Sequence, residues 1–440
     1  ADEGKGAEDG AAAPTGGVDS GDDELDGEVL LELGDDDVPP EDDDEEEGED
    51  GVDGAGEGGA GGGEDEAADN SATVFTGHAD AVYAVALNSA AEHADLALSG
   101  GGDDRGFLWR LSDGSVVAEL AGHTDTIIDV AFSADGSLAA TAALDGVVKV
   151  WAVPSGELVQ TLEGPSEDLE WIQWHSKGNV LLAGSKDATM WMWLAQTGKC
   201  MHVFAGHEGS VICGSFTGNG KAIVTGSEDG TVRLWNPKDG TCTHVFAGKD
   251  GHTAPIVSLE VHPTKALVLT GALDGVAKLM NFAGKTVVGT LVHDKGDEGA
   301  AAGGDGDDDE DGIGLASVEC VGFCRSDAHH WCATGATDGT LKVWDCSSMR
   351  LRQTMKHEAG IVSLQWDRRA PTVYTASVDC TLRSWDARTG ECLSVLVGHS
   401  DMVLTLTVSY RKHFLSAGGA AGGAGGAGGA GGAGDAAGDG

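Results

Sequence analysis

An aspartate recurs along this chain at nearly constant intervals, and in most repeats a tryptophan follows it six positions later. The aspartates are Asp103, Asp145, Asp187, Asp229, Asp274, Asp338 and Asp379, at steps of 42, 42, 42, 45, 64 and 41 residues. The tryptophans are Trp109, Trp151, Trp193, Trp235, Trp344 and Trp385, and Met280 takes the place after Asp274. A period of roughly 40–45 residues is typical of a β-propeller, in which each repeat folds into one four-stranded blade. We therefore expect an all-β propeller.

Each repeat consists of a loop, usually with Gly-His, followed by short apolar strands with turn residues between them. In the second repeat we expect strands at Thr126–Phe132, Leu138–Ala142, Val147–Trp151 and Leu158–Leu162, since Asp-Gly pairs such as Asp145-Gly146 favour tight hairpin turns. Eight repeats open at Gly77-His78, Gly122-His123, Gly164-Pro165, Gly206-His207, Gly251-His252, near Gly314, at His357 and at Gly398-His399. We predict eight blades with an incomplete last blade, and the repeat count leaves seven blades as the alternative.

The eighth repeat breaks off after two expected strands, Met402–Val408 and His413–Ala417. Beyond them the chain changes to Gly-Gly-Ala repeats, which are poor strand formers and flexible. Ala72–Phe75 precedes the first Gly-His pair, where an outer strand belongs, so it is the candidate for a strand that completes the last blade. Because the sequence predicts no third strand for it to pair with, we expect a weak seam at this blade.

The formal net charge of −48 is spread unevenly along the chain. Residues 1–70 hold 29 acidic residues and one lysine. We predict that this leader is a disordered acidic tail, because it lacks the apolar surface that would offset the entropy of ordering. A second acidic run, 293–313, is expected as a loop insertion, 417–440 as a Gly/Ala-rich flexible tail, and 71–416 as the propeller. A chain this acidic repels nucleic acid and anionic lipid and attracts basic proteins, so we expect a protein partner, no direct nucleic acid and no membrane.

Compartment and cofactors are constrained by what the sequence lacks. It shows no run of about 18 apolar residues for a membrane span and no start resembling a secretory signal. Nine scattered cysteines, without a C-x-x-C pair, suit reduced thiols in a cytoplasmic protein, with the nucleus as a second compartment. Cys320, Cys324, His329, His330 and Cys332 form a local cluster. We favour buried strand cysteines over a zinc site there, and we expect no metal or other cofactor.

A histidine, a hydroxyl residue, an aspartate and a tryptophan recur together in four repeats. The sets are His78, Ser99, Asp103 and Trp109; His123, Thr141, Asp145 and Trp151; His207, Thr225, Asp229 and Trp235; and His357, Thr375, Asp379 and Trp385. A hydrolase needs one such set in one cleft, whereas copies at a fixed period indicate a structural function in every blade. We interpret each set as a buried hydrogen-bond relay that satisfies polar groups inside the sheet. We assign no catalytic residue and expect no enzymatic activity.

The Gly-His…Trp-Asp spacing, complete at Trp344-Asp345 and Trp385-Asp386, is similar to that of WD40 repeats over about 345 residues. More narrowly, the chain resembles the angio-associated migratory cell protein family. The segments that carry this resemblance are Glu167–Trp171 with Trp174-His175, Leu181–Gly184, Trp191–Trp193, Val318–Cys324, His357–Leu364 and Arg383–Gly390. The acidic leader and the acidic insertion fit the family too, and the missing end of the eighth repeat departs from it.

The resemblance implies a non-enzymatic, protein-binding scaffold. Some members of the family are described as chaperones that escort a basic large-subunit ribosomal protein during 60S assembly, and animal members are linked to cell migration and receptor signalling. The acidic composition favours the first function. We therefore expect a monomeric chaperone in ribosome biogenesis, and a signalling or cell-migration scaffold with several protein partners is the alternative.

Acidic residues close to the loop histidines mark the end of the propeller where a basic partner would bind. In an antiparallel meander the Gly-His loops and the Asp turns lie at the same end, and the acidic insertion belongs to one of these loops. The candidate binding residues are Asp80, Asp125, Asp168, Glu170, Trp171, Glu208, Glu358 and Asp401. Their carboxylates would receive lysine and arginine, and Trp171 would offer a flat apolar or cation–π contact. The alternative is ordinary solvated loop charge, worth only about 0–1 kcal/mol for each exposed pair.

Overall fold

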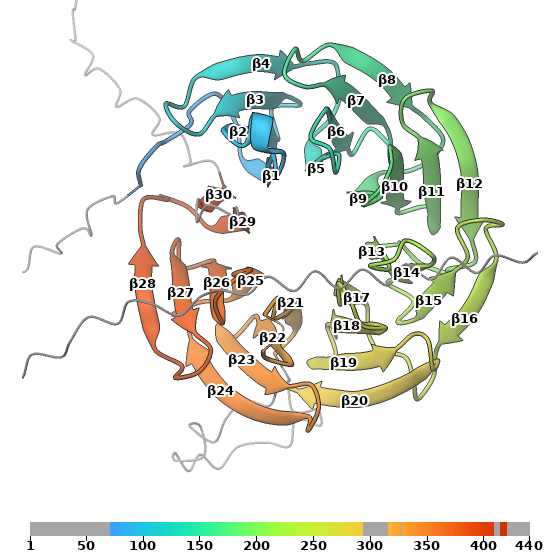
Figure 1. Ribbon diagram of the computed structural model, residues 1–440, viewed down its shortest axis with the longest axis vertical. Helices are drawn as coiled ribbons and strands as arrows, with labels where there is room; N and C mark the ends of the chain where they lie inside the picture. Colours follow the sequence, from blue (N-terminus) through green and yellow to red (C-terminus); the bar gives the residue numbers. More distant parts are fainter. Residues whose placement is uncertain (1–70, 294–315, 327, 409–413, 420–440) are drawn as a thin grey trace, which may run out of the picture. The chain divides into compact units, whose positions relative to one another are not determined.

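The computed structural model describes residues 71–293, 316–326, 328–408 and 414–419 of the chain (Figure 1). The acidic leader 1–70, the acidic insertion apart from His293, and the tail beyond Gly419 lie outside the described residues. The described part is built from β-strands, with one short 3₁₀ helix, η1 (Ala91–His93). No helix in it has the length and apolar character that crossing a membrane requires.

The strands follow one another as antiparallel meanders, so each sheet consists of consecutive strands. In chain order they are β1 (Val82–Leu87), β2 (Leu96–Gly101), β3 (Gly106–Arg110), β4 (Val116–Leu120), β5 (Ile127–Phe132), β6 (Leu138–Ala143), β7 (Val148–Ala152), β8 (Leu158–Leu162), β9 (Leu169–Trp174), β10 (Val180–Ser185), β11 (Thr189–Leu194), β12 (Lys199–Ala205), β13 (Cys213–Phe216), β14 (Ile223–Gly226), β15 (Val232–Trp235), β16 (Cys242–Phe246), β17 (Ile256–Val261), β18 (Leu267–Ala272), β19 (Val276–Asn281), β20 (Thr286–Val292), β21 (Val318–Phe323), β22 (Trp331–Ala336), β23 (Thr340–Asp345), β24 (Arg350–Lys356), β25 (Ile361–Trp366), β26 (Thr372–Ser377), β27 (Leu382–Asp386), β28 (Cys392–Leu396), β29 (Val403–Val408) and β30 (Phe414–Gly418).

Seven of the sheets, from β1–β4 to β25–β28, have four strands each, and the eighth has two. The structure therefore has seven blades, and our prediction of eight is wrong. The eighth repeat contributes only β29 and β30 within the described residues. The sequence that follows is mostly Gly and Ala, which are poor strand formers. The innermost strands still form a closed ring, since β29 lies between β25 and β1 (Figure 1).

The core lies between neighbouring blades rather than within one sheet. The second strand of a blade is buried along its length, as in β6, whereas β8, a fourth strand, buries only Leu162 completely. The tryptophan of one blade packs against the blade before it, as Trp151 does against Leu108 and Leu120. Met280 takes the same place in the fifth blade and is fully buried. The regular spacing of tryptophans is therefore the spacing of the blade interfaces.

The segment before the first blade lies at the seam of the ring. Ala72–Phe75 is not a strand, because the described residues provide no third strand at this position for it to pair with. Phe75 nevertheless holds the position two residues before Gly-His that Phe204 holds in the third blade. Its ring stacks on Trp109 with centroids 4.6 Å apart and planes 5° from parallel. The first blade thus keeps an aromatic contact at the seam although the strand is missing.

Polar side chains on the innermost strands tie neighbouring blades together. A side-chain oxygen of one blade accepts a hydrogen bond from the backbone of the next: Asp129 from Ile172 (2.8 Å), Gln173 from Phe216 (2.7 Å), Glu260 from Phe323 (2.5 Å) and Gln365 from Val408 (2.5 Å). Burial raises the pKa of Asp129 to about 6, although backbone hydrogen bonds oppose this shift. The carboxylate therefore stabilises the contact between blades but is costly to ionise there.

Candidate protein-binding face

A chain of hydrogen bonds connects the tryptophan to the aspartate in the fourth blade. Trp235 Nε1 donates to Thr225 Oγ1 at 2.8 Å, Thr225 Oγ1 lies 2.8 Å from His207 Nε2, and His207 Nδ1 lies 2.9 Å from Asp229 Oδ2. The arrangement is consistent if the histidine is neutral and carries its proton on Nδ1, since the hydroxyl then donates to Nε2. Every polar side chain in this series of hydrogen bonds has a partner.

The structure brings together each of the four sets that the sequence analysis identified. The same contacts join His78 to Asp103 (2.9 Å) and Ser99 (2.9 Å), His123 to Asp145 (3.0 Å) and Thr141 (2.8 Å), and His357 to Asp379 (3.0 Å) and Thr375 (2.6 Å), with Trp109, Trp151 and Trp385 donating to the hydroxyls. The threonine side chains belong to completely buried residues. A substrate cannot reach hydroxyls that are enclosed in this way, so the relay is structural.

Further blades contain variants that sequence reasoning missed. In the fifth blade His252 bonds Thr270 (2.9 Å) and Asp274 (3.1 Å). In the sixth blade the loop histidine is His293, whose Nε2 lies 2.5 Å from Thr334 Oγ1. Our prediction that this repeat opens near Gly314 is wrong, because the acidic insertion separates this histidine and threonine by 41 positions instead of 18. The available signal was a histidine placed directly before an acidic run.

The third blade, which has Pro165 and Ala183 where other blades have histidine and threonine, anchors its aspartate differently. Asp187 accepts hydrogen bonds from the backbone nitrogen and the hydroxyl of Ser166, at 2.9 and 3.2 Å. It also accepts one from the hydroxyl of Thr189 at 2.5 Å. The turn aspartate therefore ties down the loop of this blade without an imidazole.

Burial and hydrogen bonding set the charge state of the relay in opposite directions. Burial lowers the pKa of His357 and outweighs the nearby carboxylate of Asp379, so the imidazole is neutral at pH 7. Burial alone would raise the pKa of Asp379, but hydrogen bonds from Thr381 and His357 outweigh it, and the pKa is lowered. The result is a neutral histidine held by an ionised aspartate.

The relay also identifies one end of the ring, which we call the relay face. Each relay aspartate lies in the turn between the second and third strands of its blade, and each relay histidine lies in the loop before the first strand. Their hydrogen bonds place these loops and turns together. The turns between first and second strands and between third and fourth strands lie at the other end, which we call the opposite face, because the strands are antiparallel.

Four of the candidate acids, Asp80, Asp125, Glu208 and Glu358, are exposed on the relay face, and Asp401 is partly exposed. Each follows a loop histidine by one or two positions. The relay positions these loops, since the backbone nitrogens of Glu208 and Glu358 donate to the relay aspartates of their blades at 3.0 and 3.2 Å. The acids are therefore displayed at equivalent places around the ring.

Trp171 does not provide the flat surface that we expected. Its residue is only 8% exposed, and its Nε1 donates to the carbonyl of Val211 at 2.9 Å. Gly184 and Gly214 leave room for the indole, because a Cβ at either position would lie within 2.3 Å of it. The partner-binding role assigned to Trp171 is wrong for this physical reason: the ring fills a space between two blades.

The acids beside Trp171 form a small cluster on the relay face. Asp168 Oδ2 pairs with Lys186 Nζ at 2.7 Å. Burial raises the pKa of Glu170, Lys186 opposes this shift, and the charges of Glu228 and Asp168 add to it. Glu228, which the sequence analysis missed, is exposed and holds the same turn position as Lys186, one residue before the relay aspartate. This alignment was the signal that could have found it.

The cysteine and histidine cluster of the sixth blade is distributed between the core and a turn. Cys320, Cys324 and Cys332 are buried, whereas His329 stacks on Trp331 with ring centroids 4.0 Å apart. Within the described residues no group of three or more His, Cys, Asp or Glu side chains is arranged to hold a metal ion. The buried cysteines pack in the interfaces of the sixth blade with its neighbours.

The meandering blades, the interblade tryptophans and the buried relay define a WD40-repeat β-propeller, a class of fold that generally serves as a scaffold for protein interactions. The family model described as "WD domain, G-beta repeat" matches residues 114–152, 156–193, 198–236, 240–281, 316–345 and 349–386.

Curated relatives narrow this class. The chain is 37% identical over 347 residues to the angio-associated migratory cell protein of Homo sapiens, covering 79% of the chain and 77% of that protein. The protein of the same name from Canis lupus familiaris matches with the same identity and coverage. The chain belongs to the angio-associated migratory cell protein family. A shorter match, 27% identical over 179 residues, is to the ribosome biogenesis protein WDR12 homolog of Drosophila erecta and covers 39% of the chain and 40% of that protein.

Solved structures share the architecture. Sqt1 from Chaetomium thermophilum, in its structure bound to the N-terminus of the ribosomal protein L10, matches with a TM-score of 0.69 and 20% identity, covering 80% of the chain and 98% of that structure. Sqt1 of Saccharomyces cerevisiae matches with a TM-score of 0.68 and 22% identity, covering 80% of the chain and 96% of that structure. At these identities the likeness concerns the fold.

Proposed function

We propose that this chain is a non-enzymatic chaperone that binds and escorts a basic large-subunit ribosomal protein during 60S assembly. It acts as a monomer in the cytoplasm, with the nucleus as a second compartment, and has no direct contact with nucleic acid. The observation that carries the proposal is the set of exposed carboxylates at equivalent positions on the relay face, including Asp80, Asp125, Glu208 and Glu358.

The electrostatics of the chain support a basic partner. Single exposed ion pairs contribute only about 0–1 kcal/mol, so one carboxylate would not select a ligand. Several carboxylates at fixed spacing around one rim can engage a lysine- and arginine-rich segment together, and the net charge of −48 accelerates its approach. Because such attraction is screened by salt, binding should weaken as ionic strength rises.

The comparisons lend support of two kinds. The Sqt1 structure is that of a similarly folded chain bound to the N-terminus of a ribosomal protein. The shorter Drosophila erecta match is to a protein named for ribosome biogenesis. Neither fact concerns the carboxylates of this chain, so the proposal requires a direct test.

The test measures binding of the full chain to a fluorescent peptide covering the N-terminus of ribosomal protein L10, by anisotropy at about 50 and 300 mM salt. The variant Asp125→Lys/Glu208→Lys reverses two charges on the relay face. Its matched control, Glu157→Lys/Glu391→Lys, makes the same charge change at exposed residues on the opposite face. We expect the first variant to lose about tenfold or more in affinity and the control about twofold. Equal losses in both variants would contradict the proposed face.

The second candidate is a signalling or cell-migration scaffold with several protein partners. The observation that favours it is the name of the 37% identical relatives, which refers to migratory cells. Depletion of the protein separates the two functions. A fall in free 60S subunits supports the chaperone, whereas normal subunit levels together with an interactome free of ribosomal proteins support the scaffold.

A further inference from the structure

Apolar side chains are exposed together on the relay face where the seventh blade, the two-stranded sheet and the first blade meet. Tyr83, Val378 and Met402 are 43%, 42% and 40% exposed, and Val362 and Leu404 are partly exposed. We call these five residues the apolar arc. Single exposed apolar residues are ordinary on a protein surface, whereas a group of neighbouring ones marks a contact site.

The members of the apolar arc come from neighbouring parts of the ring. Strands β25, β29 and β1 lie side by side at its inner edge (Figure 1). The turn that carries Val378 is tied to the start of β25, because the backbone nitrogen of Val378 donates to the carbonyl of Gly360 at 2.9 Å. Gly419 donates in the same way to the carbonyl of Met402 at 3.0 Å. Since neighbouring sheets pack about 10 Å apart, the arc extends over roughly 20 Å, the length of about six residues of extended chain.

The local backbone explains why these side chains are not covered. Tyr83, Val362 and Leu404 each occupy a bulge near the start of their strand, where the pairing with the second strand shifts register. A bulge leaves its extra residue out of the ladder and re-aims the side chain. In the first blade Gly102 takes the turn position that Val378 has in the seventh, and a Cβ there would lie 3.4 Å from the ring of Tyr83. The glycine therefore leaves one side of this ring open.

Negative charge borders the apolar arc. The acids Asp80, Glu358 and Asp401 follow the loop histidines of the same three repeats. Within the described residues, the relay-face loops and turns of these repeats contain one lysine or arginine, Arg105. Its guanidinium pairs with Glu119 of β4 at 2.9 Å. The surface is thus an apolar patch with an acidic border, which complements an apolar group surrounded by cations.

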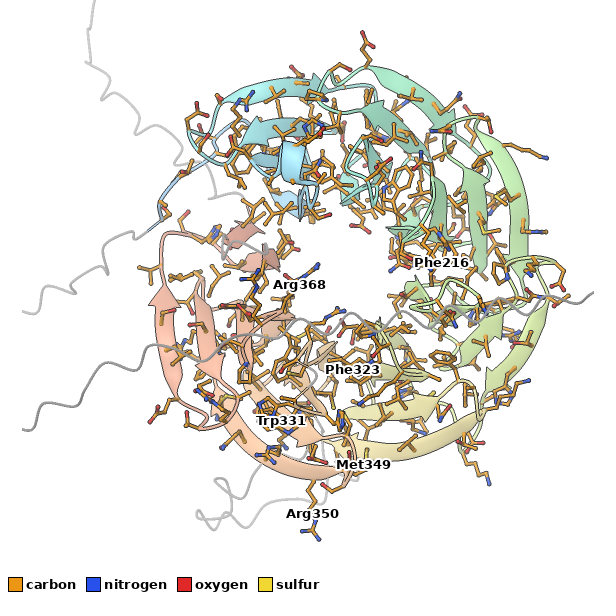
Figure 2. The ribbon with its side chains drawn as sticks, viewed as in Figure 1. Phe216, Phe323, Trp331, Met349, Arg350 and Arg368 are labelled. Carbon is orange, nitrogen blue, oxygen red and sulfur yellow. The ribbon has the colours of Figure 1, made fainter. Side chains whose placement is uncertain are left out.

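Other residues close to the arc in the sequence do not reverse this charge. Arg368, which Figure 2 shows at the inner edge of the ring, belongs to the turn after β25 and therefore to the opposite face. Residues 420–440, outside the described residues, consist of Gly, Ala and two Asp, so they supply no large apolar side chain and no cation. The undescribed residues 294–315 hold nine acids and one lysine, and 409–413 connect β29 to β30 at the ends of these strands that belong to the opposite face.

We propose that the apolar arc binds an aromatic or large aliphatic side chain that stands among lysines and arginines in the partner segment. The inference rests on the proposed function, because it concerns the same face and the same basic partner, and it adds the residue type that gives specificity. Charge alone does not distinguish one basic segment from another, whereas a buried apolar side chain does. A second copy of this chain fits the arc less well, because it would bring its own acids against those on the border.

The experiment uses the full chain and two fluorescent peptides, followed by anisotropy at about 50 and 300 mM salt. The anchor peptide is Lys-Arg-Lys-Gly-Phe-Leu-Gly-Lys-Arg-Lys, and the plain peptide has Gly-Ser in place of Phe-Leu. We expect the anchor peptide to bind about tenfold or more tightly. The variant Val378→Ser/Met402→Ser should remove this preference at both salt concentrations, because an apolar contact is not screened. The matched control is Leu158→Ser/Leu351→Ser, at residues 50% and 47% exposed on the outer strands β8 and β24, and it should keep the preference within about twofold.

The outcomes separate this inference from the proposed function. Equal binding of the two peptides to the parent, or an equal loss of preference in the control variant, would overturn the apolar site. The proposed function would still stand if Asp125→Lys/Glu208→Lys weakened binding of both peptides. If neither salt nor this charge reversal weakened binding, the basic partner would be contradicted.

A second copy of the chain is tested separately by analytical ultracentrifugation of the parent. Self-association that Val378→Ser/Met402→Ser abolishes would assign the apolar arc to an interface between copies and overturn the proposal. Circular dichroism checks that the variants are folded. The single change Tyr83→Ser, at an exposed residue of the arc, gives the same readout with the two peptides if the double variant is unstable.

Discussion

The hydroxyl at the middle of each relay is the group whose removal tests the structural interpretation most directly. Thr225 is completely buried, accepts a hydrogen bond from Trp235 Nε1 at 2.8 Å and lies 2.8 Å from His207 Nε2. Valine has nearly the same shape but no hydroxyl. Thr225→Val would therefore leave an indole N–H and an imidazole nitrogen buried without their partner.

The expected effect follows from these two losses. A buried polar group without a partner costs about 1–3 kcal/mol, and the methyl group that replaces the hydroxyl recovers about 1 kcal/mol. We expect Thr225→Val to lower the free energy of unfolding by about 2–4 kcal/mol and the melting temperature by roughly 3–6 °C. Urea unfolding followed by tryptophan fluorescence measures the first quantity, and thermal unfolding followed by circular dichroism measures the second.

Thr225→Ser is the matched control, because it keeps the hydroxyl. The first blade already uses Ser99 at this position, with His78 Nε2 at 2.9 Å and Trp109 Nε1 at 3.3 Å. We expect the serine variant to lose about 1 kcal/mol or less, the effect of one missing methyl group. The relay interpretation is refuted if the valine variant lies within about 0.5 kcal/mol of the parent, or if the two variants are equally unstable.

Further changes test three separate parts of the fold. Burial raises the pKa of Asp129 to about 6, so the folded chain binds a proton that the unfolded chain releases, and stability falls as the pH rises from about 4 to 6. The carboxylate keeps partial contact with solvent, so Asp129→Asn should raise the free energy of unfolding by only about 1–2 kcal/mol at pH 8 and by little at pH 4. Urea titrations at the two pH values measure this difference, and an equal gain at both would contradict burial as its cause. Ala188 has a φ of 65°, which glycine adopts more easily, so Ala188→Gly should raise the free energy of unfolding by about 0.5–1 kcal/mol. Gly230→Ala should lower the free energy of unfolding by more than about 1 kcal/mol, because the new Cβ would lie 2.8 Å from a carbonyl oxygen. Phe75→Ala should lower the free energy of unfolding by about 1–2 kcal/mol, because it removes the ring stacked on Trp109. Val74→Ala, at a residue that is 61% exposed, is the control, and an equal loss in both variants would show that the seam needs no aromatic contact.

The relay and the interblade tryptophans could be predicted from sequence because both depend on position within a repeat. A histidine, a hydroxyl and an aspartate at spacings of 18 and 22 residues must meet whenever successive strands are antiparallel and of constant length. His293 was missed because the acidic insertion breaks this spacing while leaving the hydrogen bond to Thr334 in place. Spacing is thus a sufficient signal only where loops have their usual length.

Trp171 was misjudged because exposure depends on a neighbouring blade. Its position corresponds to Asp129 in the second blade and to Cys213 in the fourth, so the periodic alignment indicated a variable residue near the relay face. The decisive neighbour is Gly214, at a place where Val130 and Ile172 stand in the two preceding blades. A large side chain in one blade opposite a glycine in the next blade indicates that the large side chain packs between the two blades. Neither residue alone predicts this burial.

The two faces differ in charge although the chain as a whole is acidic. The reason is that alternate loops and turns of each antiparallel blade lie on alternate faces of the ring. Residues beside the relay are mostly acidic, as Glu208 and Glu228 are, whereas the turns after β17, β21 and β25 carry Lys265, Arg325 and Arg368. Strands of about six residues separate the faces by roughly 20 Å, about twice the distance over which 0.1 M salt screens charge. Lys265→Gln, a change on the opposite face, should therefore leave the affinity of a basic peptide for the relay face within about twofold of its original value. A loss of affinity as large as that of Asp125→Lys/Glu208→Lys in an anisotropy titration would contradict this division.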